Sequence, residues 1–409
     1  MHKREQLSSP FEIIRNKLAA FILVFFTLSW WSLSLLVFKN FCQPMEALNP
    51  SIVIIARALY CTSIITFSII ASFINKRIRR LPFLYYWMLM GTFFSLIPIL
   101  LNRFDQQHLF FASVTLGFAF GIGLPSCLAF FADMTNFENR GSLSGVVFLI
   151  SSLIVGIIAV ILSGTDLKIT ALSAGLWRVV GLILFALLLP KKEGEAKAHI
   201  HTSFSSIFGN RHFLLYFIPW CAFSLIEWFE SPIRMNVFGE FATLAEIIGV
   251  TLGGISAAIG GVFSDRVGRK IIVLYSFVSI GIAYATLSIL PTNILVWWFF
   301  AVVDAVAFGS IYIIFILTIW GDLSRQSERQ KYYAIGTIPF FLAGILELVV
   351  RPYVASIRPE AAFSLASFFL FIAVIPLLFA PETLPEKTIK ERELKEYVEK
   401  AKKVKEKYG

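Results

Sequence analysis

The segment Gly261-Val-Phe-Ser-Asp265-Arg266-Val-Gly268-Arg269-Lys270 lies between two long apolar stretches of the chain. Its glycines, Gly261 and Gly268, allow backbone segments to approach closely and to turn tightly. The carboxylate of Asp265 can lie against the positive end of a neighbouring helix. The pattern therefore predicts a short charged loop that joins two helices and contacts a third.

The apolar stretches on either side of this loop are part of a strongly hydrophobic chain. Of its 409 residues, 57% are hydrophobic and 15% are charged, and the mean hydropathy is +0.77. Soluble proteins hold about 45–50% apolar and about 25% charged residues, and a single soluble core stops growing near roughly 250–300 residues. The composition excludes a soluble enzyme, a disordered protein and a nucleic-acid binder. It predicts an all-α polytopic membrane protein.

Twelve stretches of the chain are long and apolar enough to cross a membrane. A spanning helix needs about 20 apolar residues, whereas a β-barrel needs alternating polarity over segments of about ten residues, which the sequence lacks. The predicted spans are Leu18–Phe38, Ile52–Ile74, Pro82–Leu101, His108–Phe131, Leu143–Leu162, Thr170–Leu189, Phe213–Ser231, Leu244–Val262, Ile271–Leu290, Ile294–Trp320, Tyr332–Val350 and Ala361–Ala380.

Lysine and arginine are distributed unevenly between the two sides of these spans. With the N-terminus in the cytoplasm, that side receives 28 of the 36 residues, the outer side receives 6, and two lie within spans. The positive-inside rule therefore predicts a multi-pass protein of the cell membrane with both termini in the cytoplasm. The net charge of +10 follows from this topology and predicts no nucleic-acid partner.

Two pairs of loops repeat at almost one offset. Asn75 and Asp265 occupy similar charged loops 190 residues apart, and Asp133 and Asp322 occupy a second pair 189 residues apart. This agreement predicts a duplicated six-helix unit, which is typical of transporters that bind substrate at the repeat interface. The predicted parts are an N-tail (1–17), an N-terminal bundle (18–190), a cytoplasmic linker (191–210), a C-terminal bundle (211–380) and a charged cytoplasmic tail (381–409).

These loops resemble those of the major facilitator superfamily. The segment from Gly261 to Lys270 is similar to the family's G-x-x-x-D-R-x-G-R-K loop at every defined position. The segment Asp133…Arg140-Gly141…Gly145 resembles the family's loop between the fourth and fifth helices. The first-half copy departs from the pattern at Asn75, Lys76 and Ile78, so the two halves are not expected to gate equivalently. The resemblance implies 12 transmembrane helices in two pseudo-symmetric six-helix bundles.

The resemblance also implies a gate at the cytoplasmic face. Arg266 and Arg269 can pair with Asp322 in the same half, and with Asp133 or Glu138 across the halves, which would favour an outward-open state. The alternative is that these residues are only the positive charge expected on the cytoplasmic side. The predicted gate residues are Gly261, Asp265, Arg266, Gly268, Arg269, Asp133, Arg140, Asp322 and Arg329.

Ionisable residues within spans are costly and are usually functional. In the family the first, fourth, seventh and tenth helices line the cavity, so Glu227 and Asp304 are expected to face one another or a substrate. A carboxylate removed from water can be neutralised by a proton, so either could carry a coupled proton. Glu230 is a further candidate, although it could instead pair with Arg234 at i, i+4 near the outer surface.

Two arginines also lie within spans. Arg57 could bind a substrate carboxylate or pair with an acid at an outer gate. Arg178 is expected at an outer contact of the sixth helix, which in the family packs toward lipid.

Aromatic residues complete the set of substrate-binding candidates. Trp30 and Trp31 lie deep in the first span, where an indole can stack on an organic solute, although packing is the commoner role. Phe308 lies on the same predicted helix face as Asp304.

The predicted function is a secondary active transporter that moves a small organic solute by alternating access, with proton symport as one mode. A facilitative uniporter and a multidrug or organic-ion exporter are the alternatives of the same fold. A non-transporting receptor or an intramembrane enzyme is the alternative from another class, but the sequence lacks G-x-S-x-G, H-E-x-x-H and P-loop motifs. The four cysteines give no metal spacing. We predict no enzymatic activity, no cofactor and no metal. The expected partners are the solute, protons and the lipid bilayer, with the protein as a monomer.

Overall fold

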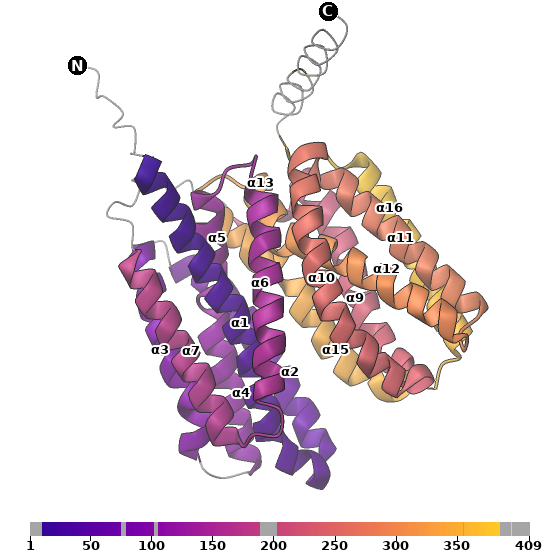
Figure 1. Cartoon of the computed structure of the whole chain (residues 1–409), viewed down its shortest axis with the longest axis horizontal. Helices are drawn as coiled ribbons and strands as arrows, with labels where there is room; N and C mark the ends of the chain where they lie inside the picture. Colours follow the sequence, from indigo (N-terminus) through magenta and orange to yellow (C-terminus); the bar gives the residue numbers. More distant parts are fainter. Residues whose placement is uncertain are drawn as a thin grey trace, which may run out of the picture.

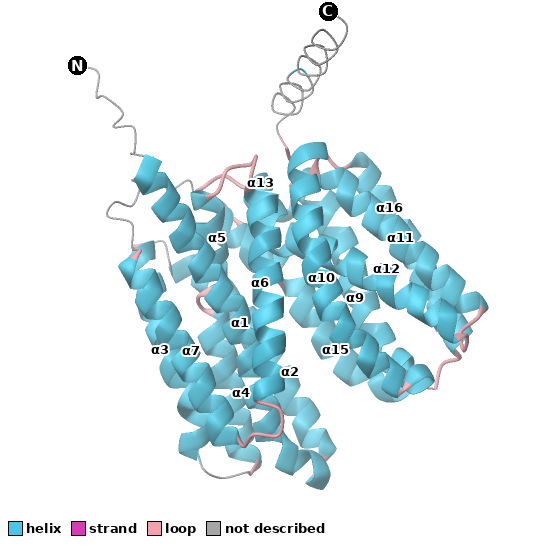
Figure 2. Cartoon of the chain, in the orientation of Figure 1, coloured by secondary structure: helices cyan, strands magenta, loops and turns pink. Residues whose placement is uncertain are grey.

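The computed structural model describes residues 10–74, 79–101, 105–188, 203–354, 356–384 and 394. These residues are helical apart from short loops and turns (Figure 2). Of the predicted N-tail, only residues from Pro10 onward are described. Most of the predicted linker lies outside the described residues, as does the predicted tail after Leu384 except for residue 394.

Within the described residues, twelve helical stretches are long and apolar enough to cross a membrane. The first six are α1 (Pro10–Leu48), α2 (Pro50–Ile74), α3 (Arg80–Leu101), the pair α4 (Gln106–Gly121) and α5 (Leu124–Met134), α6 (Arg140–Ile161) and α7 (Leu167–Leu187). The second six are α9 (Arg211–Phe238), α10 (Glu240–Val267), α11 (Arg269–Ile289), the series α12 (Ile294–Ile313), η1 (Ile314–Thr318) and α13 (Ile319–Leu323), the pair α14 (Arg329–Gly336) and α15 (Ile338–Val354), and α16 (Pro359–Phe379). The predicted number of spans and the predicted fold class are confirmed.

The helices form two bundles, one from each half of the chain, that lie side by side (Figure 1). The start of α1 and the end of α16 lie at the same end of the molecule, which we call the terminal end (Figure 1). One seam between the bundles is formed by α6 and α10, and another by α2 and α15. The short helix α8 (Phe204–Phe208) precedes α9, and its Phe204 ring contacts Phe73 of α2.

Several helices begin at a polar cap that the sequence supplies. The side chain of Asp105 accepts a hydrogen bond from the His108 amide at the start of α4, and Asp166 accepts one from Ile169 at the start of α7. Such caps satisfy backbone N–H groups that have no partner within the helix. Hydrogen bonds from the His108 amide and ring also hold the pKa of Asp105 below its usual range.

The seam between α6 and α10 depends on small residues. A Cβ added at Gly261 would lie 2.3 Å from the Gly141 carbonyl oxygen, and one added at Gly145 would lie 2.3 Å from the Ala257 oxygen. The two backbones are therefore in direct contact, as in other membrane helix pairs that use small residues.

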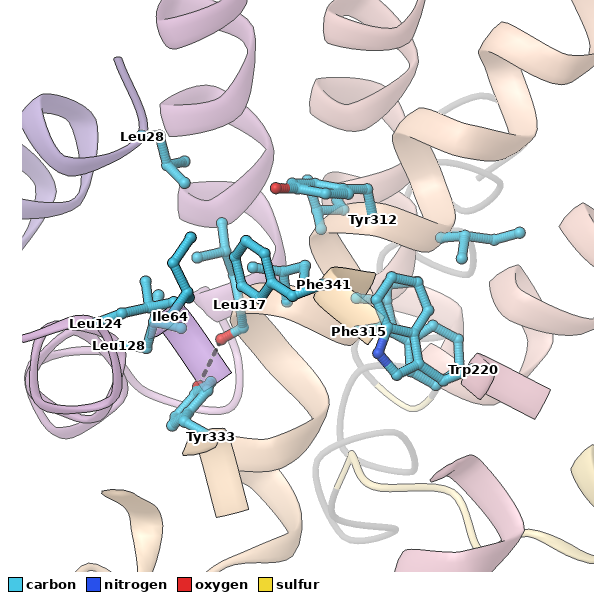
Figure 3. Packing of buried hydrophobic residues seen from close by; sticks show 14 of the residues in the cluster. Leu28, Ile64, Leu124, Leu128, Trp220, Tyr312, Phe315, Leu317, Tyr333 and Phe341 are labelled. Carbon is cyan, nitrogen blue, oxygen red and sulfur yellow. Dashed lines mark hydrogen bonds between the residues drawn. The ribbon is translucent and has the colours of Figure 1, made fainter. Parts of the chain in front are cut away.

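The tenth span is interrupted by η1, a π-helix of five residues. The Tyr333 hydroxyl donates to the Leu317 carbonyl oxygen over 2.7 Å (Figure 3). The Thr318 hydroxyl lies 3.4 Å from that of Ser144 in the other half. π-Helical turns are frequent at functional sites. This one separates the part of the span that carries Asp304 from the part that carries Asp322.

Two predicted spans are shorter than the helices in the structure. The first predicted span covers Leu18–Phe38, whereas α1 has 39 residues. The seventh predicted span ends at Ser231, whereas α9 continues to Phe238 with Pro232 inside it. Arg234 therefore lies within a spanning helix, whereas the topology prediction placed it in an outer loop.

Candidate functional site

The second bundle contains a cluster of charged residues between α9 and α12, which we call the charged cluster: Glu227, Glu230 and Arg234 of α9 with Asp304 of α12. Arg234 Nη2 donates to Glu227 Oε1 over 3.0 Å, and its Nη1 lies 3.6 Å from Asp304 Oδ2. Arg234 Nη1 also lies 3.5 Å from the Tyr284 hydroxyl of α11. The sequence prediction that Glu227 and Asp304 face one another is consistent with this geometry, but it overlooked Arg234 as the residue between them.

Three carboxylates surround one guanidinium in this cluster. Glu227 and Asp304 each use one oxygen for Arg234, while Glu227 Oε2 and Asp304 Oδ1 are buried without a hydrogen-bond partner. Glu230 is only 2% exposed, and its Oε2 is also unpartnered. The described ion pairs of Arg234 are with Glu227 and Asp304 and do not include Glu230, because the long Arg234 side chain reaches Glu227 two helical turns away.

Aromatic contacts lie on both sides of the charged cluster along α9 and α12. Toward the terminal end, Phe223 contacts Phe308 with ring centroids 6.2 Å apart. Toward the opposite end, Phe238 stacks on Trp297 at 4.1 Å. The side chains of Glu227 and Asp304 nevertheless keep 18% and 19% exposure. The predicted candidate Phe308 thus lies directly beside the cluster.

A second group of rings crosses the interface between the two bundles. Trp31 of α1 stacks on Phe120 of α4 and contacts Phe340 and Phe341 of α15. Figure 3 shows Phe341 near Leu317, in a cluster that also holds Ile64 and Leu124 of the first bundle.

These rings continue to the charged cluster. Phe340 contacts Tyr312, which stacks on Phe308 at 5.4 Å. A continuous series of ring contacts therefore leads from Trp31 at the bundle interface to Phe308 beside the charged cluster.

Trp30 lies elsewhere, in the interior of the first bundle. It is fully buried and donates to the Ser95 hydroxyl over 2.8 Å. The guanidinium of Arg178 lies 4.4 Å from the Trp30 ring and 4.3 Å from the Trp87 ring. Arg178 was expected at an outer contact of the sixth span, and its side chain is fully buried in the first bundle. Trp30 packs here instead of facing the bundle interface.

Arg57 forms an ion pair with Glu46, with its Nη2 3.2 Å from Glu46 Oε1. The two side chains are 31% and 50% exposed. This pair joins α1 and α2 of the same bundle, so it does not bridge the two halves.

A second charged network lies at the terminal end of the bundles. Asp265 accepts hydrogen bonds from the amides of Gly141 and Ser142 at 2.9 and 2.7 Å, at the first residues of α6. It thus stabilises the positive end of a helix in the other half. Gly268 has a φ of +112° and lies against the carboxylate of Glu382.

Two ion pairs in this network cross between the halves. Asp322 pairs with Arg140, and it also accepts from Arg269 Nε at 3.1 Å within its own half. Asp133 pairs with Arg329 across the halves and with Arg80 within its own half. Arg266 is exposed. A cavity of about 490 Å³ beside this network is lined by Ala132, Asp133, Thr135, Asn136, Phe137, Glu138, Arg140, Gln326 and Arg329.

Several residues of the two networks were not foreseen from the sequence. Arg234 was assigned to a loop, and Arg80 was not assigned to the gate. The segment Pro381-Glu382-Thr383 was not assigned to the gate, yet Glu382 caps the start of α11 and the Thr383 hydroxyl lies 3.2 Å from Asp322 Oδ2. An acid directly after the last span was the only sequence signal for this contact. Among the described residues, no group of three or more His, Cys, Asp or Glu is arranged to hold a metal ion.

Twelve helical stretches that are long and apolar enough to cross a membrane form two bundles, with charged networks inside one bundle and across one end. The model of the Major Facilitator Superfamily matches residues 235–406. The second half of the chain is thus similar to this superfamily, in line with the resemblance of its loops.

Two solved structures have folds similar to that of this chain. The human organic anion transporter MFSD10 (TETRAN) is 14% identical, with a TM-score of 0.70, covering 90% of this chain and 100% of that one. The proton:xylose symporter XylE bound to 6-bromo-6-deoxy-D-glucose is 13% identical, with a TM-score of 0.71, covering 92% and 97%. No curated protein matches the sequence.

Proposed function

We propose that this transporter moves a small organic solute by alternating access and couples that movement to protons through the charged cluster. The observation that carries the proposal is the excess of carboxylates in the second bundle, where Glu227, Glu230 and Asp304 surround the single cation Arg234. Two further positive charges are needed to neutralise this cluster. Buried, uncompensated charge is costly in a membrane, so protons are natural occupants of the free carboxylate oxygens.

The network at the terminal end supports an alternating-access mechanism. Ion pairs between Arg140 and Asp322, and between Asp133 and Arg329, join the two halves at that end. With the termini in the cytoplasm, as we propose from the positive-inside rule, these pairs close the cytoplasmic side in an outward-facing state. Opening that side requires both pairs to break.

The charge of the cluster also bears on the type of solute. An anion would be repelled by the excess of carboxylates, so the cluster favours a neutral or cationic solute. XylE is a proton:xylose symporter, which makes xylose a useful neutral probe, and MFSD10 is an organic anion transporter, which makes an organic anion the contrasting probe. A facilitative uniporter would instead carry its solute without proton movement.

The test uses the full-length protein in liposomes that contain the pH indicator pyranine. D-xylose, benzoate and 2-phenylethylamine are added in turn, and internal acidification reports proton uptake. We expect the wild-type chain to move protons with at least one of the two non-anionic probes. With D-xylose as the probe, Asp304→Asn should abolish pH-driven accumulation while leaving counterflow exchange of D-xylose intact, because the neutral amide cannot release a proton.

Asp105→Asn is the matched control. It also removes one acid, but from an exposed helix cap where asparagine caps equally well. Normal pH-driven accumulation by Asp304→Asn would refute coupling through this residue. Solute exchange with no proton movement in the wild-type chain would establish uniport instead.

A further inference from the structure

The charged cluster has a pattern of used and unused oxygens that bears on its ligand. Glu227 gives Oε1 to Arg234 and leaves Oε2 unpartnered, and Asp304 gives Oδ2 and leaves Oδ1 unpartnered. Glu230 adds a third unpartnered oxygen, and its side chain is almost completely buried. Unpartnered buried polar atoms cost free energy, so a donor that reached these oxygens would stabilise the cluster.

The chemistry of these atoms restricts what that donor can be. An ionised carboxylate accepts hydrogen bonds and donates none, so the ligand must present N–H or O–H groups. Arg234 already shows how a cation is held, since its guanidinium bridges Glu227 and Asp304 through one oxygen of each. A second cation can use the remaining oxygen of each carboxylate without displacing Arg234.

The charge balance favours a ligand that carries a positive charge. When its three carboxylates are ionised, the cluster lacks two positive charges, and an ammonium group supplies one of them together with up to three N–H donors. A neutral hydroxyl supplies donors but leaves the charge unchanged. One ammonium and one proton bound together neutralise the cluster, which allows the solute and the proton to travel in the same direction.

The surroundings of the cluster define the rest of the ligand. Phe308 is only partly buried and stacks on Tyr312, and Phe300 lies 5.6 Å from the Arg234 guanidinium. Aromatic faces attract cations and bury apolar groups. The series of rings from Phe308 toward Trp31 offers an apolar surface that begins about one helical turn from Asp304 on α12.

We propose that the charged cluster binds the ammonium group of a monovalent organic amine, with the apolar part of the amine against Phe308 and Tyr312. This inference rests on the proposed function, because it names the substrate class of the same site. The titratable and charged groups that face the bound ammonium are Glu227, Glu230 and Arg234 of α9, Tyr284 of α11 and Asp304 of α12.

The test measures equilibrium binding to the purified full-length protein in detergent, by calorimetry, so that it does not depend on transport. The probes are 2-phenylethylamine, its neutral counterpart 2-phenylethanol, and trimethyl(2-phenylethyl)ammonium, which keeps the charge but has no N–H. We expect the amine to bind about tenfold or more tightly than either of the others, because hydrogen bonds between charged groups are among the strongest.

Amide variants then locate the site. Asp304→Asn and Glu227→Gln should each weaken amine binding by about tenfold or more, whereas Asp105→Asn should leave it unchanged. If Asp304→Asn does not yield folded protein, Glu227→Gln and Glu230→Gln provide the same comparison. Equal binding of amine and alcohol, absence of amine binding by the folded wild-type chain, or unchanged binding by the amide variants would overturn the inference.

The outcomes for the two proposals are separable. Proton uptake driven by xylose without amine binding leaves the proposed function intact and overturns the amine inference. Amine binding that depends on Asp304, without proton-coupled movement of any probe in liposomes, supports the amine site and overturns the proposed coupling.

Discussion

Arg178 illustrates how a single charged residue can be accommodated inside a membrane bundle without an acid. Its guanidinium lies between the indole rings of Trp30 and Trp87, and its one described hydrogen bond is to the Thr27 hydroxyl over 3.4 Å. Its Nε and Nη2 atoms have no hydrogen-bond partner. The stabilisation therefore comes mainly from the two aromatic faces, which a planar guanidinium can contact at the same time.

This stacking predicts a large difference between two conservative substitutions. Arg178→Lys should lower the free energy of unfolding by about 1–3 kcal/mol, because an ammonium cannot stack on two rings at once. Arg57→Lys should change it by less than about 0.5 kcal/mol, because the Arg57–Glu46 pair is exposed. Thermal unfolding of the two variants in detergent checks this, and equal losses of stability would contradict the role assigned to the rings.

Residue-scale contacts were also the hardest to foresee from the sequence. Placing Arg234 in a loop followed from the apolar run ending near Ser231, and pairing it with Glu230 followed from the i, i+4 rule. Helix α9 continues past Pro232, and the arginine side chain points back along the helix toward Glu227. The contact with Asp304 depends on tertiary packing of α9 against α12, which no local pattern encodes. Trp30 likewise could not be separated from Trp31, although only Trp31 contacts the other bundle.

At the scale of elements, the last turn of α10 contacts the start of α6. Asp265 accepts from two amides of α6, so its charge stabilises the terminal end of the seam between the halves. Asp265→Asn should therefore favour opening of that end. The reporter is Ser144→Cys, a buried seam position, in a background without the four native cysteines. Labelling of this cysteine by a membrane-impermeant maleimide should be faster in the Asp265→Asn variant than in the parent protein, which keeps Asp265.

Asp166→Asn is the matched control for this experiment. Asp166 also caps a helix, but within its own half at α7, so labelling of the reporter should be unaffected. An unchanged labelling rate in Asp265→Asn would count against a gate that depends on this carboxylate.

Two glycines of α6 allow a second test of the same seam. A Cβ at Gly145 would lie 2.3 Å from the Ala257 carbonyl oxygen, whereas one at Gly156 would meet nothing within 4 Å. Gly145→Ala should push α6 from α10 and speed labelling of the Ser144→Cys reporter. Gly156→Ala should leave labelling unchanged and raise stability by up to about 1 kcal/mol, through helix propensity. Equal behaviour of the two variants would show that the close seam does not control access.

At the scale of the whole molecule, the sequence was sufficient for the architecture because the membrane restricts it. Only helices that close their own hydrogen bonds can cross the bilayer as single segments, so twelve apolar runs led directly to twelve spans. The recurrence of Asn75 and Asp265, and of Asp133 and Asp322, divided them into two halves. Which ion pairs join the halves depended on distances across the seam, and these came only from the structure.

Movement of the two bundles as units predicts that a single covalent link across the seam stops transport. The Sγ of Cys61 on α2 lies 3.9 Å from where a Cβ would lie at Gly344 on α15, so Gly344→Cys places a thiol near bonding distance of the native one. Oxidation should link the halves at this seam and abolish counterflow of the transported probe, and a reductant should restore it. The same oxidation of Cys61→Ser/Gly344→Cys should have no effect. Full-rate solute exchange by the cross-linked chain would contradict this prediction. It would mean that the α2–α15 seam stays fixed during transport, and that access to the site alternates through movement of the other seam and the interrupted tenth span alone.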